Sequence, residues 1–128
     1  MPSMSPRILI AEDDPFLQKV FAAELAKAGF SVLTAQDGDT ALRMMHDEKP
    51  SLLLLDMLMP GKNGFAVLEE RSRQPELQAI PVIILSSLGQ EDDVARAMKL
   101  GASDYFLKSN TDLEKLVGLM KQAMKATT

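Results

Sequence analysis

The sequence predicts a single α/β domain built on a doubly wound, five-stranded parallel sheet with helices on both faces. Short apolar runs alternate along the chain with stretches that repeat apolar residues at helical spacing. Two of these runs, residues 52–55 and 82–85, are apolar without interruption, which is typical of strands buried on both faces of a parallel sheet. No internal repeat or linker interrupts the alternation, so right-handed crossovers are expected to place helices on both faces of one sheet.

The first βα unit starts with the apolar run at residues 7–12. A helix at residues 14–28 follows, because apolar side chains recur there at a spacing of three or four residues, and Gly29 ends it. Asp14 is expected to be the N-cap of this helix, where an acidic side chain is favourable. The second unit opens with a short strand at residues 31–35.

The turn at residues 37–38 leads into a second helix that ends near residue 48. The third strand, at residues 51–56, contains the unbroken leucine run and is therefore expected in the middle of the sheet. The third helix, at residues 64–73, carries Phe65 on its inward face.

The fourth strand is the apolar run at residues 81–86, and a helix at residues 91–100 follows it. The fifth strand occupies residues 104–107. The last helix has the clearest apolar stripe in the chain. Thr111 and Glu114 have the spacing of a capping box, so Thr111 is predicted to cap this helix.

Length and composition limit the possible functions. The 128 residues fit one domain, which we expect to span residues 7–126 after a flexible leader at residues 1–6. A net charge of −4 disfavours binding of nucleic-acid phosphates by this domain. No apolar run approaches the ~20 residues needed to span a bilayer, so no membrane segment is expected. The chain has no cysteine, which favours a reducing, cytoplasmic setting.

Acidic side chains follow the first and third predicted strands at the point where each strand ends. Asp56 closes the leucine run, and Glu12 and Asp13 close the first strand. In a sheet of order 2-1-3-4-5, the chain reversal falls between these two strands, where open α/β sheets place their ligands. Carboxylates gathered at this edge repel one another, so a cation is expected, and Mg²⁺ prefers oxygen ligands of this kind. The sequence therefore predicts a divalent-metal site at this edge.

Four motifs, each at the end of a predicted strand, occur in order along nearly the whole chain, at residues 8–14, 55–61, 84–87 and 101–108. Together they resemble the receiver domain of the response regulators of two-component signalling, the chemotaxis regulator among them. The resemblance implies a flavodoxin-like fold and a function in phosphoryl transfer.

Position by position, the resemblance implies that Asp56 is the phosphoacceptor. It also implies a Mg²⁺ site in which Asp13, Asp56 and the backbone carbonyl of Leu58 bind the ion directly. Glu12 completes the acidic pair and is expected to act through a water molecule.

Three further positions match residues of known role in the family. Lys108 stands at the position of the family's invariant lysine, Ser86 at that of the switch hydroxyl, and Tyr105 at that of the switch aromatic residue. The resemblance implies that Ser86 donates a hydrogen bond to the phosphoryl group and follows it on modification.

The expected function is that of a phosphoacceptor in a phosphorelay. A sensor histidine kinase or a histidine phosphotransfer protein would supply the phosphoryl group, and an output partner would bind a face formed by residues 91–100, 104–107 and the last helix. The domain would be no enzyme, apart from catalysing its own phosphorylation and dephosphorylation. It would be a monomer or a phosphorylation-dependent dimer, and would stand alone or belong to a longer regulator or hybrid kinase.

Three other functions fit parts of the pattern. A magnesium-dependent phosphatase or phosphotransferase with an aspartyl-phosphate intermediate typically has a second aspartate two residues after the nucleophile, where this chain has Leu58. A flavodoxin-like flavin binder needs a hydroxyl- and glycine-rich loop after the first strand, where this chain has the acidic residues 12–14. A pseudo-receiver that serves only for docking does not require the chemical residues, all of which are present here.

Two departures from the family pattern affect the expected chemistry. The family usually has a cis proline after the lysine, whereas Ser109 follows Lys108 here. A cis bond without proline costs roughly 2.5–4 kcal/mol, so either the site holds that strain or the loop is trans and re-routed. We favour the cis bond slightly, because Lys108 must still reach Asp56. The second departure is that Leu58 and Leu88 are apolar at positions that flank the phosphoryl group in receivers.

Overall fold

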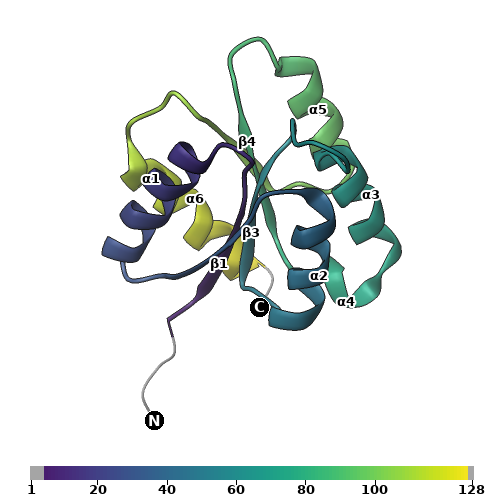
Figure 1. Cartoon of the computed structure of the whole chain (residues 1–128), viewed down its shortest axis with the longest axis horizontal. Helices are drawn as coiled ribbons and strands as arrows, with labels where there is room; N and C mark the ends of the chain where they lie inside the picture. Colours follow the sequence, from purple (N-terminus) through teal and green to yellow (C-terminus); the bar gives the residue numbers. More distant parts are fainter. Residues whose placement is uncertain (1–4, 127–128) are drawn as a thin grey trace.

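The computed structural model describes residues 5–126 as a five-stranded sheet covered by helices on both faces (Figure 1). The strands are β1 (Arg7–Ala11), β2 (Ser31–Ala35), β3 (Leu52–Asp56), β4 (Val82–Ser86) and β5 (Asp104–Leu107). The helices are α1 (Pro15–Lys27), α2 (Gly38–Glu48), α3 (Gly64–Arg73), α4 (Pro75–Gln78), α5 (Glu91–Lys99) and α6 (Leu113–Ala126).

All strand pairs are parallel, and the strand order is β2-β1-β3-β4-β5. The predicted doubly wound sheet and its order are therefore confirmed. The direction in which successive strands are added to the sheet reverses between β1 and β3. The carboxyl ends of these two strands therefore flank the crevice where such sheets bind ligands.

Two hydrophobic layers enclose the sheet. Helices α1 and α6 pack on one face, and α2, α3, α4 and α5 cover the other, as Figure 1 shows on either side of β1 and β3. Strand β3 lies inside both layers because its leucines alternate: Leu53 and Leu55 face α2 and α3, whereas Leu52 and Leu54 face α1 and α6. Each of these fully buried leucines contributes roughly 1.5–3 kcal/mol, which fixes the end of β3 in place.

Two local features differ from the sequence-based expectation. The short helix α4 was not predicted; Pro75 begins it, and its one buried residue, Leu77, fills the layer beside α2 and α3. The capping box was predicted wrongly, because α6 begins at Leu113 and Oδ1 of Asp112 accepts from the N–H of Lys115 at 3.1 Å. Asp112 stands directly before the helix and carries a better capping group than Thr111.

The predicted N-cap of the first helix is confirmed. Oδ1 of Asp14 accepts hydrogen bonds from the N–H of Phe16 at 2.9 Å and of Leu17 at 3.3 Å. Pro15 occupies the first position of α1, where its missing N–H has no intrahelical partner to lose. These two signals start α1 immediately after the acidic residues that end β1.

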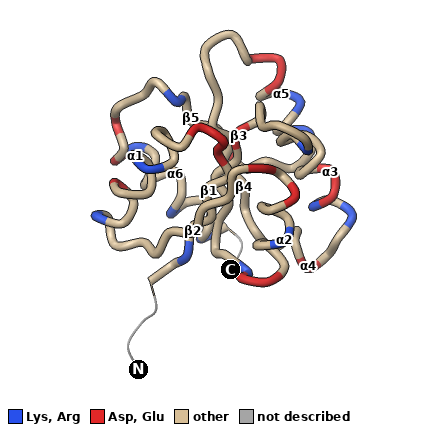
Figure 2. The backbone as a smooth tube through the Cα atoms, in the orientation of Figure 1, with Lys and Arg blue, Asp and Glu red and all other residues tan. Residues whose placement is uncertain are grey.

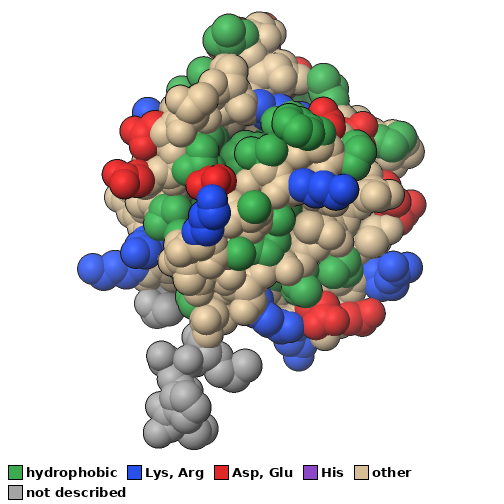
Figure 3. All heavy atoms as spheres, turned by 60° about the vertical axis from the view of Figure 1, so that its left-hand side comes forward, with side chains coloured by type: hydrophobic (Ala, Val, Ile, Leu, Met, Phe, Trp, Pro, Cys, Tyr) green, Lys and Arg blue, Asp and Glu red, His purple; other side chains and the backbone are tan. Residues whose placement is uncertain are grey.

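The described part of the chain contains no helix long and apolar enough to cross a bilayer. On the face drawn in Figure 3, basic and acidic side chains are interspersed among hydrophobic ones, so this face has no continuous basic surface. Of the predicted leader, residues 1–4 lie outside the described residues, and the proposed domain limits stay a prediction.

Candidate functional site

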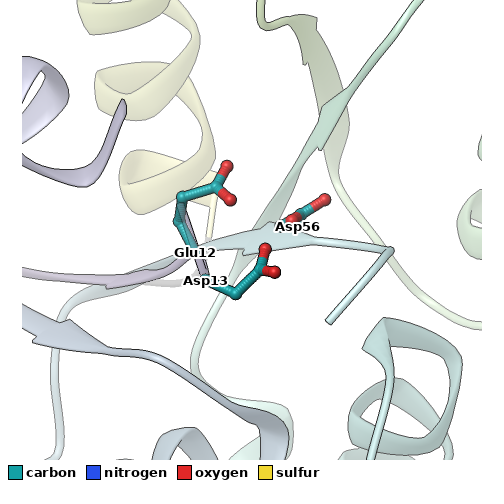
Figure 4. Close-up of side chains that lie close together, drawn as sticks. All are labelled: Glu12, Asp13 and Asp56. Carbon is teal, nitrogen blue, oxygen red and sulfur yellow. The ribbon is translucent and has the colours of Figure 1, made fainter. Parts of the chain in front are cut away.

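Three carboxylates meet at the carboxyl edge of the sheet. Glu12 and Asp13 follow β1, and Asp56 is the last residue of β3, which pairs with β1 up to Ala11 and Leu55. In the backbone view of Figure 2, acidic positions lie at this edge, and Figure 4 shows the three side chains turned toward one another. One oxygen from each of the three lies within 4.8 Å of the others. The predicted cluster is thus assembled.

The three carboxylates differ in burial. Glu12 is 0% and Asp56 1% exposed, whereas Asp13 is exposed to solvent. Two buried negative charges need compensation, because transfer of a carboxylate out of water is costly unless it is paired. Asp13, being exposed, lies on the solvent side of the cluster.

Lys108 supplies the compensating charge. Its ammonium nitrogen lies 2.8 Å from Oε1 of Glu12 and 3.1 Å from Oδ1 of Asp56, and its side chain is 18% exposed. No peptide bond among residues 5–126 is cis, so the expected cis bond between Lys108 and Ser109 was wrong. Because the Lys108 side chain reaches both carboxylates from a trans backbone, the loop avoids the roughly 2.5–4 kcal/mol of a cis bond without proline.

Backbone N–H groups hold the two buried carboxylates in place. The N–H of Leu58 donates to Oδ1 of Asp56, and the N–H of Asp14 donates to Oε2 of Glu12, both at 3.1 Å. The loop after β3 is itself anchored, because Met57 and Met59 are buried in the layer beside α2 and α3. Leu58, between them, is 61% exposed.

This environment changes the ionisation of both partners. Burial, with the charge of Glu12, raises the pKa of Asp56 to about 7, although the N–H of Leu58 and the ammonium of Lys108 act against the rise. Burial alone lowers the pKa of Lys108, but its hydrogen bonds to Glu12 and Asp56 and their charges outweigh burial and raise that pKa. Lys108 is therefore cationic. Asp56 is readily protonated near neutral pH unless a further cation is present.

Three buried oxygens at this edge accept no hydrogen bond within the described residues, and one of them, Oε1 of Glu12, is held by the ion pair with Lys108. Oδ2 of Asp56 and Oγ of Ser86 make no hydrogen bond to any residue in the described range. Ser86 ends β4, the strand next to β3. A buried carboxylate oxygen and a buried hydroxyl without hydrogen-bond partners fit a site that a ligand from solution completes.

The predicted switch residues line a common cavity. A cavity of about 260 Å³ lies between β4, α5 and β5, and Ser86 and Tyr105 are both among its lining residues. Tyr105 is 47% exposed, so its ring is not part of the core. The structure places both residues on the wall of one cavity, and their role as a switch stays a prediction.

Two polar residues at this edge were missed from the sequence. Gln18 of α1 is buried, and its Nε2 donates to the backbone carbonyls of Glu12 at 3.1 Å and Ala35 at 3.2 Å. Lys62 joins α2 to α3 through ion pairs with Asp39, at 3.1 Å, and Glu70. Neither residue stands at a strand end or in a motif, so the sequence carried no signal for them.

Comparisons with known proteins agree with the fold. The family model of the response regulator receiver domain matches residues 8–121. The chain therefore belongs to the receiver-domain family of response regulators, and the predicted function as a phosphoacceptor domain of two-component signalling is confirmed at the level of the family.

Individual relatives show how much of each protein the chain covers. Protein PilH of Pseudomonas aeruginosa is 39% identical over 102 residues, which are 80% of this chain and 84% of PilH. The phosphate regulon transcriptional regulatory protein PhoB of Escherichia coli is 33% identical, over 95% of this chain and 53% of PhoB. A putative response regulator from Chloroflexus aurantiacus superposes with a TM-score of 0.90 at 25% identity, covering 95% of this chain and 99% of that one. The chain spans about half the length of several curated relatives, PhoB among them.

Proposed function

We propose that Asp56 is the residue that accepts the phosphoryl group. The observation that supports this most directly is the free Oδ2 of Asp56, on a carboxylate whose other oxygen is already held by Leu58 and Lys108. One oxygen is fixed while the other is available as a nucleophile. Of the three clustered carboxylates, Glu12 has both oxygens within reach of partners, and Asp13 is exposed.

The donor in this proposal is a phosphohistidine on a kinase or a phosphotransfer protein. Oδ2 of Asp56 attacks phosphorus, the P–N bond to the imidazole breaks, and its electron pair stays on the imidazole nitrogen. The product is an acyl phosphate on Asp56 and a free histidine on the donor. Lys108 balances charge on the attacking carboxylate, and Ser86 donates its unused O–H to a phosphoryl oxygen.

The residues at this edge fit a Mg²⁺ ion. Asp13, the carboxylate of Asp56 and the backbone carbonyl of Leu58 would bind it, with Glu12 acting through a water molecule. The bound ion supplies positive charge to the transferring phosphoryl oxygens. The raised pKa of Asp56 supports this assignment, because a cation at the cluster favours the ionised carboxylate that the reaction needs.

Partner binding follows from the same proposal. The donor approaches the solvent side of the cluster, beside Asp13, and an output partner uses the face formed by α5, β5 and α6, where the exposed Tyr105 lies. The chain acts on no substrate other than its own Asp56, so we propose that it is not an enzyme in its own right. The cytoplasm is the proposed compartment, and monomer and phosphorylation-dependent dimer both stay open.

The test is phosphorylation by a small donor. Acetyl phosphate or phosphoramidate with Mg²⁺ should add one phosphoryl group that hydroxylamine removes, as measured by intact mass and peptide mapping. Asp56→Asn should abolish the addition, whereas the control Asp47→Asn, an exposed residue of α2, should leave it unchanged. Undiminished label on Asp56→Asn, or label that maps to His46, would contradict the proposal.

The metal is tested separately. Titration with Mg²⁺ should move the amide resonances near Asp13 and Asp56, and Asp13→Asn should weaken binding and slow phosphorylation while the fold is retained. Resonances that stay in place throughout the titration would show that this edge does not bind the ion.

A further inference from the structure

Gln18 is a buried amide that reaches two strand ends from a helix. Its side chain leaves α1 and is 9% exposed. Nε2 donates one hydrogen bond to the backbone carbonyl of Glu12 at 3.1 Å and one to that of Ala35 at 3.2 Å. Both N–H groups of the amide are therefore committed, and the ends of β1 and β2 are tied to α1 through this one residue.

The tie to β1 fixes the backbone that carries the acidic pair. The N–H of Glu12 donates to the carbonyl of Ala35 at 3.0 Å, and the carbonyl of Glu12 accepts from Gln18. This carbonyl belongs to the peptide unit between Glu12 and Asp13, so Gln18 sets the orientation of that peptide plane. The next N–H, of Asp14, is held by the carboxylate of Glu12 at 3.1 Å.

Asp13 depends on that backbone more than its neighbours do. Its carboxylate is exposed and makes no hydrogen bond or ion pair within the described range of the chain. Glu12 and Asp56, in contrast, are each held by an N–H group and by Lys108. An oxygen of Asp13 nevertheless lies within 4.8 Å of the other two carboxylates, and the backbone is the part of this residue that hydrogen bonds hold in place.

We propose that Gln18 is a positioning residue for the metal site: by holding the peptide between Glu12 and Asp13, it keeps Asp13 aimed at the shared edge. The inference rests on the proposed function, since it assigns Gln18 to the Mg²⁺ site described above. Residues that hold a metal ligand in its orientation without touching the metal typically lower the metal affinity by about 10- to 100-fold when they are lost. A buried amide that merely satisfied two carbonyls would affect stability and leave metal affinity unchanged.

The experiment compares Mg²⁺ affinity in the unphosphorylated protein. Gln18→Met keeps the length of the side chain and removes both donors. The matched control is Gln78→Met, which removes an amide that donates to the carbonyl of Ser72 on the exposed side of α4, away from the cluster. The dissociation constant is measured from amide shifts during a Mg²⁺ titration, which reports only folded molecules, so a loss of stability does not imitate a loss of affinity.

We expect Gln18→Met to weaken Mg²⁺ binding by about tenfold and Gln78→Met to leave it unchanged. If Gln18→Met does not fold, Gln18→Asn serves instead, because it keeps the amide and is one methylene too short to reach both carbonyls. Equal Mg²⁺ affinity in the parent and in the folded Gln18 variant would overturn the positioning role while the proposed function stands. A parent protein that binds no Mg²⁺ would overturn both.

Discussion

The ammonium nitrogen of Lys108 lies 3.1 Å from Oδ1 of Asp56, although the peptide bond after Lys108 is trans and no proline follows it. The same ammonium lies 2.8 Å from Glu12. One cation thus bridges two buried carboxylates, so this buried group of three residues carries one excess negative charge when both carboxylates are ionised. This balance determines how stability responds to pH and to the loss of Lys108.

The metal-free protein should lose stability as pH rises toward neutrality. Burial raises the pKa of Asp56 to about 7 in the folded protein, from the 3.8 of an unperturbed aspartate. Between these values the folded protein keeps a proton that the unfolded chain releases, so the contribution of Asp56 falls as pH rises through this window. From pH 5 to pH 8, the free energy of unfolding should fall more in the parent than in Asp56→Asn, by on the order of 2 kcal/mol.

Urea unfolding in the presence of a chelator at pH 5, 6, 7 and 8 measures this difference. Asp47→Asn, which changes an exposed carboxylate, should follow the parent. Parallel pH profiles for the parent and Asp56→Asn would show that Asp56 ionises normally in the folded protein.

Removal of the bridging cation should destabilise the metal-free protein at high pH. Lys108→Met leaves Glu12 and Asp56 buried without compensation, and breaking a buried pair in this way costs about 3–5 kcal/mol. The loss should be smaller at pH 5, where Asp56 holds a proton, and Mg²⁺ should recover part of it at pH 8. Lys27→Met, which breaks a surface pair with Glu24 at 3.5 Å, should cost at most ~1 kcal/mol. Equal losses for the two variants in urea unfolding would argue against the bridge.

Two glycines should respond to alanine in opposite directions. A Cβ at Gly38, the first residue of α2, would overlap with the backbone carbonyl of Lys62, so Gly38→Ala should destabilise the protein by about 1–3 kcal/mol. A Cβ at Gly118 in α6 would meet nothing within 4 Å, so Gly118→Ala should stabilise it by about 0.5–1 kcal/mol through helix propensity. Thermal unfolding of both variants tests this, and a Gly38→Ala variant as stable as the parent would contradict the close contact.

The phosphorylated protein should be long-lived. Hydrolysis of an acyl phosphate needs a water molecule in line behind phosphorus, and the exposed side chains of Leu58 and Leu88, 61% and 74% accessible, offer that water no hydrogen bond. Leu58→Asn combined with Leu88→Glu should hasten loss of the phosphoryl label after the donor is removed. Since both positions are exposed, the change in stability should stay within about 0.5 kcal/mol. A double variant that loses label no faster than the parent would assign control of the lifetime to another feature or to a partner.

Local patterns in the sequence determined the architecture and the membership of the candidate site. Unbroken apolar runs occur where a strand is buried on both faces, so the leucines of β3 and the position of Asp56 at its end could be predicted without any tertiary information. The parallel order then placed Glu12 and Asp13 beside Asp56, because the carboxyl ends of adjacent parallel strands share one edge.

Contacts between distant segments were decided only by the tertiary structure. The trans bond after Lys108 depends on how far a flexible side chain must extend to Asp56, and that span is set by the packing of β5 against β4. The proposed role of Gln18 depends on two backbone carbonyls, one of them 17 residues away. Because every residue has the same backbone carbonyl, the sequence does not indicate which of them Gln18 reaches. Periodicity and turn chemistry report local backbone preference and burial; they do not report which side chain reaches which backbone group across the fold.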